Sequence, residues 1–477
     1  MANKLYEESS VSAIATAIRN KNGSSDTYTV AEMAPAIDAL SSNVVNGIIK
    51  QYKASSTTVS ANTFVEFVND GDFGTGIGDN TELVSVGGNA ELYAVMVEQD
   101  KAIVFYVASS KLCGVVCTIS GTTITVGTET QLSAQFYGKI SAANIGQNKI
   151  FVAHSDSPYS SPEGEDNQLY GIVCAVSGTT IMAGTETELA TCGRSGQDIS
   201  VVALEEDKVL ITHRKGCLGT GYKTVTLESV VCTVSGSTIT AGTPTTLSSS
   251  ASLDPRNSIA VIDTNKVFIS FCEKPDGTNN LLYGIVGTVS GDTITYGTKT
   301  QLSSVNGSGY STSVAAMSTS DKVFVSFSKN NQLYGIVCTV SGTTITAGTE
   351  AQLSTSSASN YTNPTSTALV DANTVFVSYV KSNNAYGVTC SVSGTTISVN
   401  SDVKITATNN IYAKGMGILV SNEKILYVSR KTSSTYSIYG TIVTRGQSII
   451  PSSTKIEGLT KTQCTTSTAG DVWVLDN

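Results

Sequence analysis

Two histidines and ten cysteines are the residues of this chain whose side chains best suit catalysis or metal binding. Each histidine, His154 and His213, stands five residues after a lysine that opens an alternating apolar segment. Equivalent segments carry an aromatic residue at that place, namely Tyr106, Phe271, Phe327 and Tyr379. A position that accepts Phe, Tyr or His is a packing position, and two histidines leave little for a catalytic triad or a metal site. The pattern therefore predicts buried histidines, no catalytic residue and no cofactor.

Five cysteines occupy one equivalent place along the chain: Cys117, Cys174, Cys232, Cys338 and Cys390. Equivalent places on neighbouring structural repeats lie beyond the ~7 Å Cα separation that a disulfide can bridge. Cys113 and Cys117 do not have the spacing of a zinc site either. The acidic loop at 163–166 lacks the alternating Asp/Asn pattern of a calcium loop. We expect free thiols that pack as small apolar side chains, and no bound metal.

Composition excludes several classes of partner. The chain has 477 residues, a net charge of −9 and only 14% charged residues, so it matches a nucleic-acid backbone poorly. No apolar run approaches the ~20 residues that cross a bilayer. Residues 1–12 lack the pattern of a secretory signal. These features predict a protein made in a cytoplasm, with no nucleic-acid partner and no membrane insertion.

A turn motif, Ser-Gly-Thr-Thr-Ile, recurs with small variations at intervals of 51 to 58 residues; its glycines are Gly121, Gly178, Gly236, Gly291, Gly342 and Gly394. A period near 50 residues is typical of β-propeller blades. Residues 313–353 predict four antiparallel strands, with Ser341 and Gly342 as a two-residue hairpin turn. The sequence therefore predicts an all-β propeller built from four-stranded blades.

The ends of the chain decide the blade count. Residues 88–457 hold seven repeats, and 464–475 resembles the first two strands of a further blade. Residues 63–85 resemble the last two strands, so joining both ends would close an eighth blade and hide the sheet edges. We predict eight blades within a propeller domain at 63–477. Seven blades are the alternative, because 61–64 also resembles the second-strand segment at 372–375.

The N-terminal segment differs from the repeats. Residues 1–45 predict two short amphipathic helices, whose apolar faces are formed by Val11, Ile14 and Ile18 and by Met33, Ile37 and Leu40. Two such helices bury too little surface to be stable alone, so we expect them to mediate attachment or homo-oligomerisation. Residues 46–62 predict a linker with a possible strand at 47–52.

Two stretches resemble bacteriophage proteins. Ala13-Ile-Ala-Thr-Ala-Ile-Arg-Asn-Lys-Asn-Gly23 and the Tyr28-Thr-Val-Ala-Glu-Met-Ala-Pro-Ala-Ile37 that follows resemble N-terminal segments of phage tail-associated proteins. The phrase at 333–349, Leu-Tyr-Gly-Ile-Val-Cys-Thr-Val-Ser-Gly-Thr-Thr-Ile-Thr-Ala-Gly-Thr, is similar to repeats of predicted phage structural proteins. The resemblance implies a virion protein that is assembled in the host bacterial cytoplasm. It also implies an N-terminus that binds other virion proteins and a displayed propeller.

Candidate ligand-binding residues come from the loops that vary between repeats. The turns between the first and second strands and between the third and fourth strands are uniform, whereas the other two loop classes vary and share the opposite face. On that face we expect Tyr137, Tyr159, Arg194, Tyr222, Arg256, Tyr310, Tyr361 and Tyr412. Exposed aromatic rings suit stacking on sugars or anchoring a protein. The alternative is that each tyrosine only covers its own blade junction.

Three functions compete at this stage. The leading hypothesis is a phage tail-fibre or receptor-binding protein that recognises a bacterial surface ligand, either a glycan or a protein. The second is a purely structural virion component, a decoration or baseplate protein that binds only other virion proteins. The third is a polysaccharide hydrolase. Small residues predominate in the predicted channel-lining strands, for example at 142–143 and 314–316, which argues against an enzyme.

Overall fold

The computed structural model describes most of the repeat region and four short strands outside it. The described ranges are 49–53, 65–68, 72–87, 91–134, 138–156, 167–192, 199–215, 225–250, 253–274, 280–305, 311–318, 321–330, 332–354, 366–381, 384–405, 411–432, 436–446, 448–451 and 471–475. Within them all regular structure is β. The chain forms two compact units, the larger being Asp72–Thr444.

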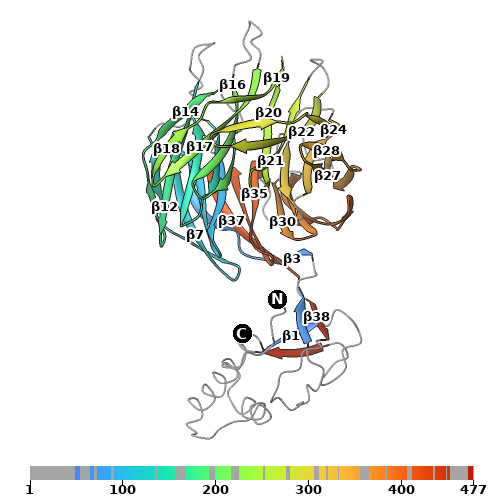
Figure 1. Ribbon diagram of the computed structural model, residues 1–477. Coiled ribbons are helices and arrows are strands. Elements are labelled where there is room, and N and C mark those ends of the chain that lie inside the picture. Colours follow the sequence, from blue (N-terminus) through green and yellow to red (C-terminus); the bar gives the residue numbers. More distant parts are fainter. Residues whose placement is uncertain are drawn as a thin grey trace, which may run out of the picture. The chain divides into compact units, whose positions relative to one another are not determined.

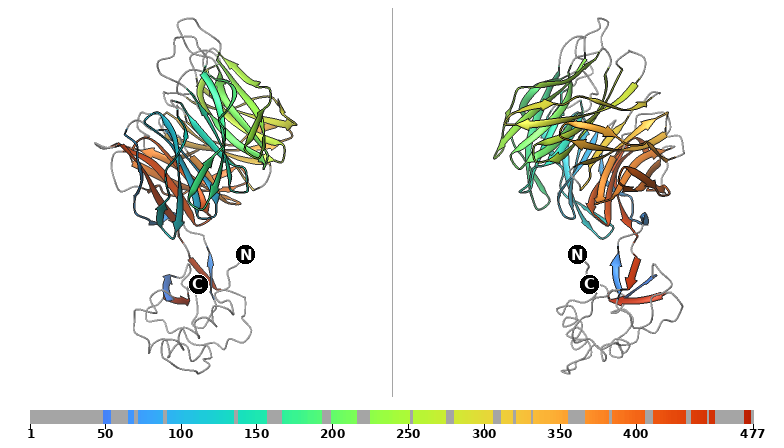
Figure 2. Two further views of the ribbon diagram at one scale, coloured as in Figure 1. Left: turned by 90° about the vertical axis from the view of Figure 1, so that its left-hand side faces the viewer. Right: turned by 45° about the vertical axis from the view of Figure 1, so that its right-hand side comes forward.

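The larger unit is a β-propeller of seven blades, each a five-stranded antiparallel sheet (Figures 1 and 2). Blade 1 consists of β5 (Leu92–Glu98), β6 (Lys101–Ala108), β7 (Lys111–Ser120), β8 (Thr123–Val126) and β9 (Thr130–Ser133); blade 2 of β10 (Ile140–Asn144), β11 (Lys149–Ser155), β12 (Asn167–Ser177), β13 (Thr180–Ala183) and β14 (Thr187–Cys192); and blade 3 of β15 (Ser200–Glu205), β16 (Lys208–Lys215), β17 (Val225–Ser235), β18 (Thr238–Ala241) and β19 (Thr245–Ser250). Blade 4 consists of β20 (Leu253–Asp263), β21 (Lys266–Glu273), β22 (Asn280–Ser290), β23 (Thr293–Tyr296) and β24 (Thr300–Val305), and blade 5 of β25 (Thr312–Ala316), β26 (Lys322–Lys329), β27 (Gln332–Ser341), β28 (Thr344–Ala347) and β29 (Ala351–Ser354). Blade 6 consists of β30 (Ser366–Asp371), β31 (Thr374–Lys381), β32 (Asn384–Ser393), β33 (Thr396–Val399) and β34 (Val403–Lys404), and blade 7 of β35 (Ile411–Ser421), β36 (Lys424–Thr432) and β37 (Tyr436–Arg445) with β3 (Phe73–Ile77) and β4 (Thr81–Ser85).

The first strand of each blade faces the centre of the ring. These seven strands contact one another in sequence, from β5 through β10, β15, β20, β25 and β30 to β35, and β35 returns to β5. The third strand pairs on its outer side with two short strands, so the predicted fourth strand is broken in two. In blade 5 the break is at Gly348, whose N–H donates to the Val337 carbonyl at 3.0 Å.

Glycine at this break is required both by its own blade and by the neighbouring one. A Cβ at Gly348 would lie 2.6 Å from the Val337 carbonyl and 3.1 Å from Thr395, which belongs to the hairpin turn of blade 6. The same contact joins Gly127 to Thr179, and Gly242 to Asp292, in other blade pairs. The repeated turn therefore lies against the break of the preceding blade, which explains why its sequence is uniform.

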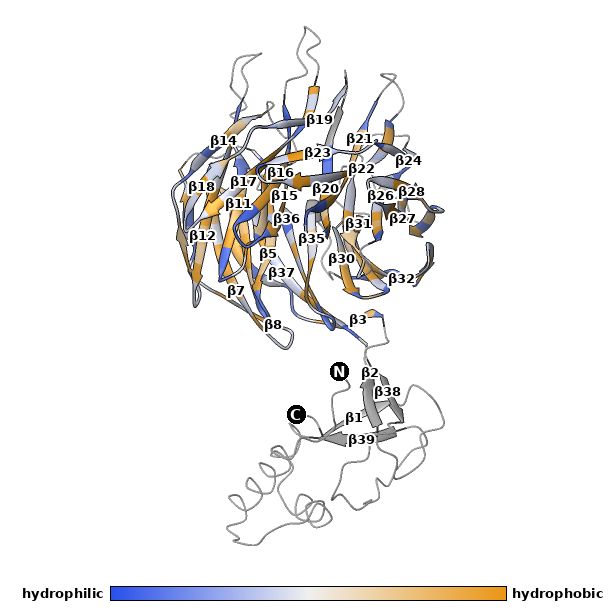
Figure 3. Cartoon of the chain, viewed as in Figure 1, coloured by the Kyte–Doolittle hydropathy of each residue, from blue (hydrophilic) through white to orange (hydrophobic). Residues whose placement is uncertain are grey.

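Apolar side chains fill the spaces between blades. The hydropathy colouring in Figure 3 shows hydrophobic residues along the blade strands. Alternation along the second strand sends successive residues to opposite neighbours. Val325 of β26 thus joins the cluster that contains Phe268 of blade 4, whereas Phe324 packs with Val377 of blade 6. The core is therefore a ring of inter-blade clusters, and the last one joins blades 7 and 1 through Leu426 and Val104.

The prediction of eight blades was wrong, and the seven-blade alternative is confirmed. Blade 7 takes β35, β36 and β37 from the C-terminal part and its outer strands, β3 and β4, from the N-terminal part. Gly78 there donates its N–H to the Ile442 carbonyl at 2.8 Å, as Gly348 does in blade 5. Because β3 and β4 already occupy the outer edge of β37, the chain after Gly446 has no edge to pair with in the ring.

The smaller unit contains the strands left over by this closure. β38 (Ser448–Pro451) pairs with β2 (Val65–Val68), and β39 (Asp471–Leu475) pairs with β1 (Ile49–Lys53). The strand predicted at 47–52 is thus observed as β1. Of the segment 464–475, predicted to begin a further blade, residues 471–475 are observed as the strand β39, which does not join a blade. The predicted helices at 1–45, with Val11, Ile14, Ile18, Met33, Ile37 and Leu40, lie outside the described residues.

In the part of the chain that the structure describes, no helix is long and apolar enough to span a membrane.

Candidate functional site

A cavity of about 690 Å³ lies at the centre of the ring. Its walls are formed by the first strands of all seven blades, together with Arg430 from the second strand of blade 7. In blade 1 the lining residues run from Glu91, which precedes β5, to Met96 within β5. The cavity therefore occupies the part of the channel next to the loops that connect one blade to the next, which is the face predicted to vary.

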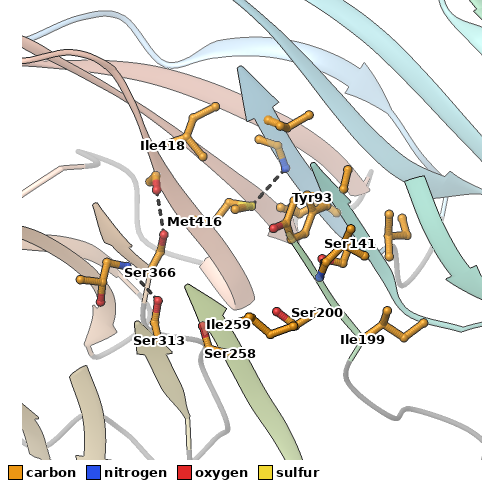
Figure 4. Close-up of a pocket in the computed structure, with 18 of the residues that line it drawn as sticks. Tyr93, Ser141, Ile199, Ser200, Ser258, Ile259, Ser313, Ser366, Met416 and Ile418 are labelled. Atoms are coloured by element: carbon orange, nitrogen blue, oxygen red, sulfur yellow. Dashed lines mark hydrogen bonds between the residues drawn. The ribbon is translucent and has the colours of Figure 1, made fainter. Parts of the chain in front are cut away.

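The cavity wall contains one level at which most blades place the same residue. Strand register aligns Tyr93, Ser141, Ser200, Ser258, Ser313, Ser366 and Met416, one from each blade in order (Figure 4). Five of these seven side chains are serines, so a belt of hydroxyl groups surrounds the cavity. We call these seven residues the serine ring.

The serine ring binds the backbone of the adjacent blade. Ser141 Oγ accepts the N–H of Val201 at 3.1 Å, and Ser258 and Ser313 accept the N–H groups of Val314 and Thr367 at 3.2 and 3.1 Å. Each first strand is the edge of its sheet, and an edge N–H needs a partner. The serine ring supplies that partner across the blade junction. Ser258 and Ser313 each accept one N–H and still have a hydroxyl hydrogen and a second lone pair for a ligand. The Ser141 hydroxyl is also hydrogen-bonded to Tyr93, and Ser366 donates its hydrogen to the Gly417 carbonyl at 2.7 Å.

The ring departs from serine where the propeller closes. Met416 of blade 7 lies with its Sδ 3.1 Å from the Ala94 N–H of blade 1. Tyr93 of blade 1 is hydrogen-bonded to Ser141, and burial raises the pKa of its hydroxyl. Figure 4 shows both side chains together on one side of the cavity. The two bulkiest members of the ring are therefore neighbours.

Four charged side chains line the cavity, three of them cationic: Glu91, Lys139, Arg256 and Arg430. Lys139 Nζ lies 2.9 Å from Glu91 Oε1, an ion pair between blades 2 and 1. In blade 4, Arg256 stands two residues before Ser258 of the serine ring and is half-buried. Arg430 is only 7% exposed, and burial lowers its pKa, although an arginine in a protein stays protonated.

Blade 7 has an unusual wall. Glycine at 415 and 417 replaces the larger residues of other blades, and a Cβ at Gly415 would lie 1.8 Å from Tyr427 Oη. Tyr427 is 1% exposed, and its hydroxyl has no hydrogen-bond partner among the described residues. Gly415 lines the cavity, so this tyrosine hydroxyl lies directly behind the cavity wall.

One predicted binding residue, Arg256, is placed at the cavity by the structure. Tyr412 falls in the strand β35 rather than in a loop. Tyr137, Tyr159, Arg194, Tyr222, Tyr310 and Tyr361 lie outside the described residues, so their role stays a prediction. The serine ring was not predicted, although its serines stand eight or nine residues before the start of each second strand.

Both histidines are buried in blade cores, as their position predicts. His154 stacks on Tyr170 with ring centroids 5.6 Å apart and lies 2.8 Å from Glu186. Burial lowers the pKa of His213 to about 4. The eight cysteines that the structure describes are buried with free thiols, and burial raises the pKa of Cys338 to about 12. Such a thiol is unreactive at neutral pH.

The tyrosine that precedes glycine in the third strand packs against an aromatic residue of its own blade. Tyr334 and Tyr386 stack on the cross-strand residues Phe327 and Tyr379, with ring centroids 6.0 Å apart in each pair. A lysine covers the outer face of each ring, 4.8 Å from the centroid for Lys381. Lys329 and Lys381 pair with Glu350 and Asp402, which directly precede the outer strands β29 and β34, so the tyrosines belong to the blade structure.

The described residues offer a limited set of chemistries. No group of three or more His, Cys, Asp or Glu side chains in the described ranges could hold a metal ion. The cavity lining contains a single carboxylate, Glu91, which is held by Lys139. Hydrolysis of a glycosidic bond ordinarily uses two carboxylates. The lining is instead rich in hydrogen-bond donors, which suits binding.

Comparisons with known proteins show no family for this chain. No family model and no curated protein matches the chain. A protein of unknown function from Dyadobacter fermentans is 11% identical, with a TM-score of 0.43 over 78% of this chain and 100% of that chain. A hypothetical selenium-binding protein from Sulfolobus tokodaii is 7% identical, with a TM-score of 0.47 over 75% and 91%. An α-L-arabinanase from Penicillium chrysogenum is 9% identical, with a TM-score of 0.43 over 70% and 99%.

Proposed function

We propose that the propeller is a recognition domain that binds a saccharide of a bacterial surface in its central cavity. The observation that carries the proposal is the cavity itself, with about 690 Å³ of space surrounded by a belt of serine hydroxyls. Ligand pockets in proteins have volumes of roughly 300–1,000 Å³. Saccharides present many hydroxyl groups, and the lining offers serine hydroxyls and arginine N–H groups to meet them.

The position of the cavity supports the same function. Its lining starts where each first strand leaves the preceding connecting loop, so a ligand in the cavity lies beside the loops that vary between blades. A rigid ring that carries variable loops is a common arrangement for binding. The tyrosines predicted in those loops would add stacking contacts to a sugar.

The resemblance of 13–37 and 333–349 to phage proteins supports a location for this domain in a virion. We propose a tail-fibre or receptor-binding protein of a virion, assembled in the host cytoplasm. Other virion proteins, and further copies of the chain, would bind through the N-terminal segment. The ligand would be a glycan or a glycosylated protein of the host surface.

The proposal is tested by measuring binding of the purified full-length chain to a panel of bacterial cells and to their extracted surface polysaccharides. Ser200→Tyr is the blocking variant, because blade 1 already accommodates a tyrosine at this level of the ring, Tyr93. We expect wild type to bind cells and block phage adsorption, and Ser200→Tyr to lose at least tenfold in affinity with an unchanged melting temperature. Thr343→Ala, in a uniform hairpin turn, is the control and should bind as wild type does.

Other outcomes would redirect the assignment. Binding to purified virions without binding to any cell would favour the structural virion component. Release of reducing sugar from the polysaccharides would favour the hydrolase. Equal binding by wild type and Ser200→Tyr would move the site away from the cavity, and the double change Tyr310→Ala with Tyr361→Ala would then test the loops.

A further inference from the structure

One side of the cavity is apolar. Where blades 7 and 1 meet, Met416 and Tyr93 line the cavity at the level of the serine ring. Two residues further along the same strands, Ile418 and Val95 line it as well. All four side chains are half-buried. We call these four residues the apolar wall.

The opposite side of the cavity is polar. The first strands contact one another in ring order, so blade 4 lies across from the junction of blades 7 and 1. Ser258 of blade 4 and Ser313 of blade 5 each accept one backbone N–H and keep a hydroxyl hydrogen to donate. Figure 4 shows these two serines on the far side of the ring from Tyr93 and Met416. The cavity is therefore amphipathic.

The second strands follow the same division. The residues that pair with the serine ring are hydroxyl-bearing in blades 3 to 6 and large and apolar in blades 1 and 7; they are Thr212, Ser270, Ser326 and Ser378 against Phe105 and Val428. The contrast between the two sides thus extends over two strands of each blade.

Large side chains at these two levels are not needed to build a propeller of this sequence. In blades 2, 4, 5 and 6 the ring serine is followed two residues later by alanine. Blades 4, 5 and 6 are consecutive in the ring, so their junctions form with serine and alanine alone at both levels. Apolar surface in contact with water is stabilised when another apolar group covers it. The apolar wall therefore favours a ligand with an apolar group on one side.

We infer that the cavity binds a 6-deoxyhexose, a sugar in which a methyl group replaces the C6 hydroxymethyl group. This inference rests on the proposed function and specifies its ligand. In a pyranose ring C5 lies directly across from C2, so a sugar whose C2 and C3 hydroxyls bind Ser258 and Ser313 directs its C5 substituent to the apolar wall. A methyl group there displaces water from apolar surface. A hydroxymethyl group would place a hydroxyl among mainly apolar atoms, which do not replace its hydrogen bonds to water.

The experiment is isothermal titration calorimetry of the full-length protein with two matched pairs of sugars. L-rhamnose and L-mannose differ only by the C6 hydroxyl, and so do L-fucose and L-galactose. We expect at least one 6-deoxy sugar to bind about tenfold or more tightly than its 6-hydroxy partner. The pair that shows the preference also identifies the configuration of the ring hydroxyls that the serines accept. Equal binding within both pairs would overturn the inference.

The variant that removes the wall is Met416→Ser with Ile418→Ala, which gives blade 7 the residues that blade 4 has at these two levels. We expect its melting temperature to stay near that of the wild type and its preference for the 6-deoxy sugar to fall to about threefold or less. A preference that stays tenfold in this variant would show that the wall does not select the methyl group, and the inference would fail.

The matched control is Val202→Ala. Val202 occupies in blade 3 the register position of Ile418 and is also half-buried, but it is not among the cavity-lining residues. This control should keep the full preference, and an equal loss in it would mark the effect as structural and overturn the inference. Absence of binding by both 6-deoxy sugars also overturns the inference, and the proposed function then still stands if the wild type binds cells and Ser200→Tyr does not.

Discussion

Replacing Phe73 by alanine should unfold the propeller at markedly lower denaturant, although this residue precedes the first complete repeat. Phe73 opens β3, is 1% exposed and lies with its ring centroid 4.9 Å from that of Phe376 in blade 6. It belongs to the cluster between blades 6 and 7 together with Ile425. Its backbone N–H also lies 3.4 Å from the Thr389 hydroxyl of blade 6.

The expected loss follows from the size of the side chain. Truncation of a fully buried phenylalanine to alanine costs about 3–5 kcal/mol, because apolar contacts are lost and a cavity remains. Urea unfolding followed by circular dichroism measures this loss as a lower midpoint. Ile77→Ala in the same strand is the control, since Ile77 is 44% exposed and should change stability by less than about 0.5 kcal/mol. A loss below about 1 kcal/mol for Phe73→Ala would refute the closure of blade 7 by β3.

Three further predictions concern individual blades. Burial lowers the pKa of His213 to about 4, so the unfolded chain, with a histidine pKa near 6.5, binds the proton first as pH falls. The contribution of His213 to stability should therefore drop by about 3 kcal/mol between pH 6.5 and 4. His213→Phe should remove this part of the pH dependence, as measured by urea unfolding at several pH values. Blade 4 pairs the buried Glu273 with Lys299, whereas blade 5 has the reverse arrangement, Lys329 with Glu350 at 2.6 Å. Lys299→Met should lower the free energy of unfolding by about 3 kcal/mol, because it leaves a buried carboxylate without its cation. The exchange Glu273→Lys with Lys299→Glu should recover more than half of the stability lost in Glu273→Lys alone. Gly348→Asn should lower the melting temperature because its Cβ would lie 3.1 Å from Thr395 in the hairpin turn of blade 6, as well as 2.6 Å from the Val337 carbonyl of its own blade. Asn400→Gly at the equivalent place in blade 6 should leave the melting temperature nearly unchanged, and equal effects of the two changes would contradict the role assigned to the hairpin contact.

Asn400 also shows why the blade count could not be settled from the repeat alone. The regular spacing of Gly342 and its equivalents predicts the blade and its strands, because turn chemistry and alternation are local. Ring closure depends on which distant strand pairs with β37, and β3 has the sequence Phe-Gly-Thr-Gly-Ile, which does not resemble the Thr-Ile-Thr of other outer strands. The sequence carries one signal of this closure, the asparagine at 400. Other blades have glycine at that place, where it contacts the hairpin turn of the next blade, and blade 7 has no such turn.

The candidate site could be predicted only in part, because it depends on strand register and on contacts between strands. Small residues in the first strands indicate a channel, and Arg256 could be chosen by its place before such a strand. The serine ring required the register between first and second strands, which the sequence leaves open by one residue because Ser313 stands nine residues before its second strand and Ser258 eight. Arg430 and Tyr427 are in a second strand, and the sequence does not show that Arg430 lines the cavity or that the Tyr427 hydroxyl lies against Gly415.

The most direct test of the account is a crystal structure of the full-length protein with an oligosaccharide released from a bacterial surface to which it binds. We predict density for a sugar inside the ring, with hydroxyls within hydrogen-bond distance of Ser258 or Ser313. Density that leaves the ring empty and occupies only the outer surfaces of the blades would contradict the central claim that the cavity is the recognition site.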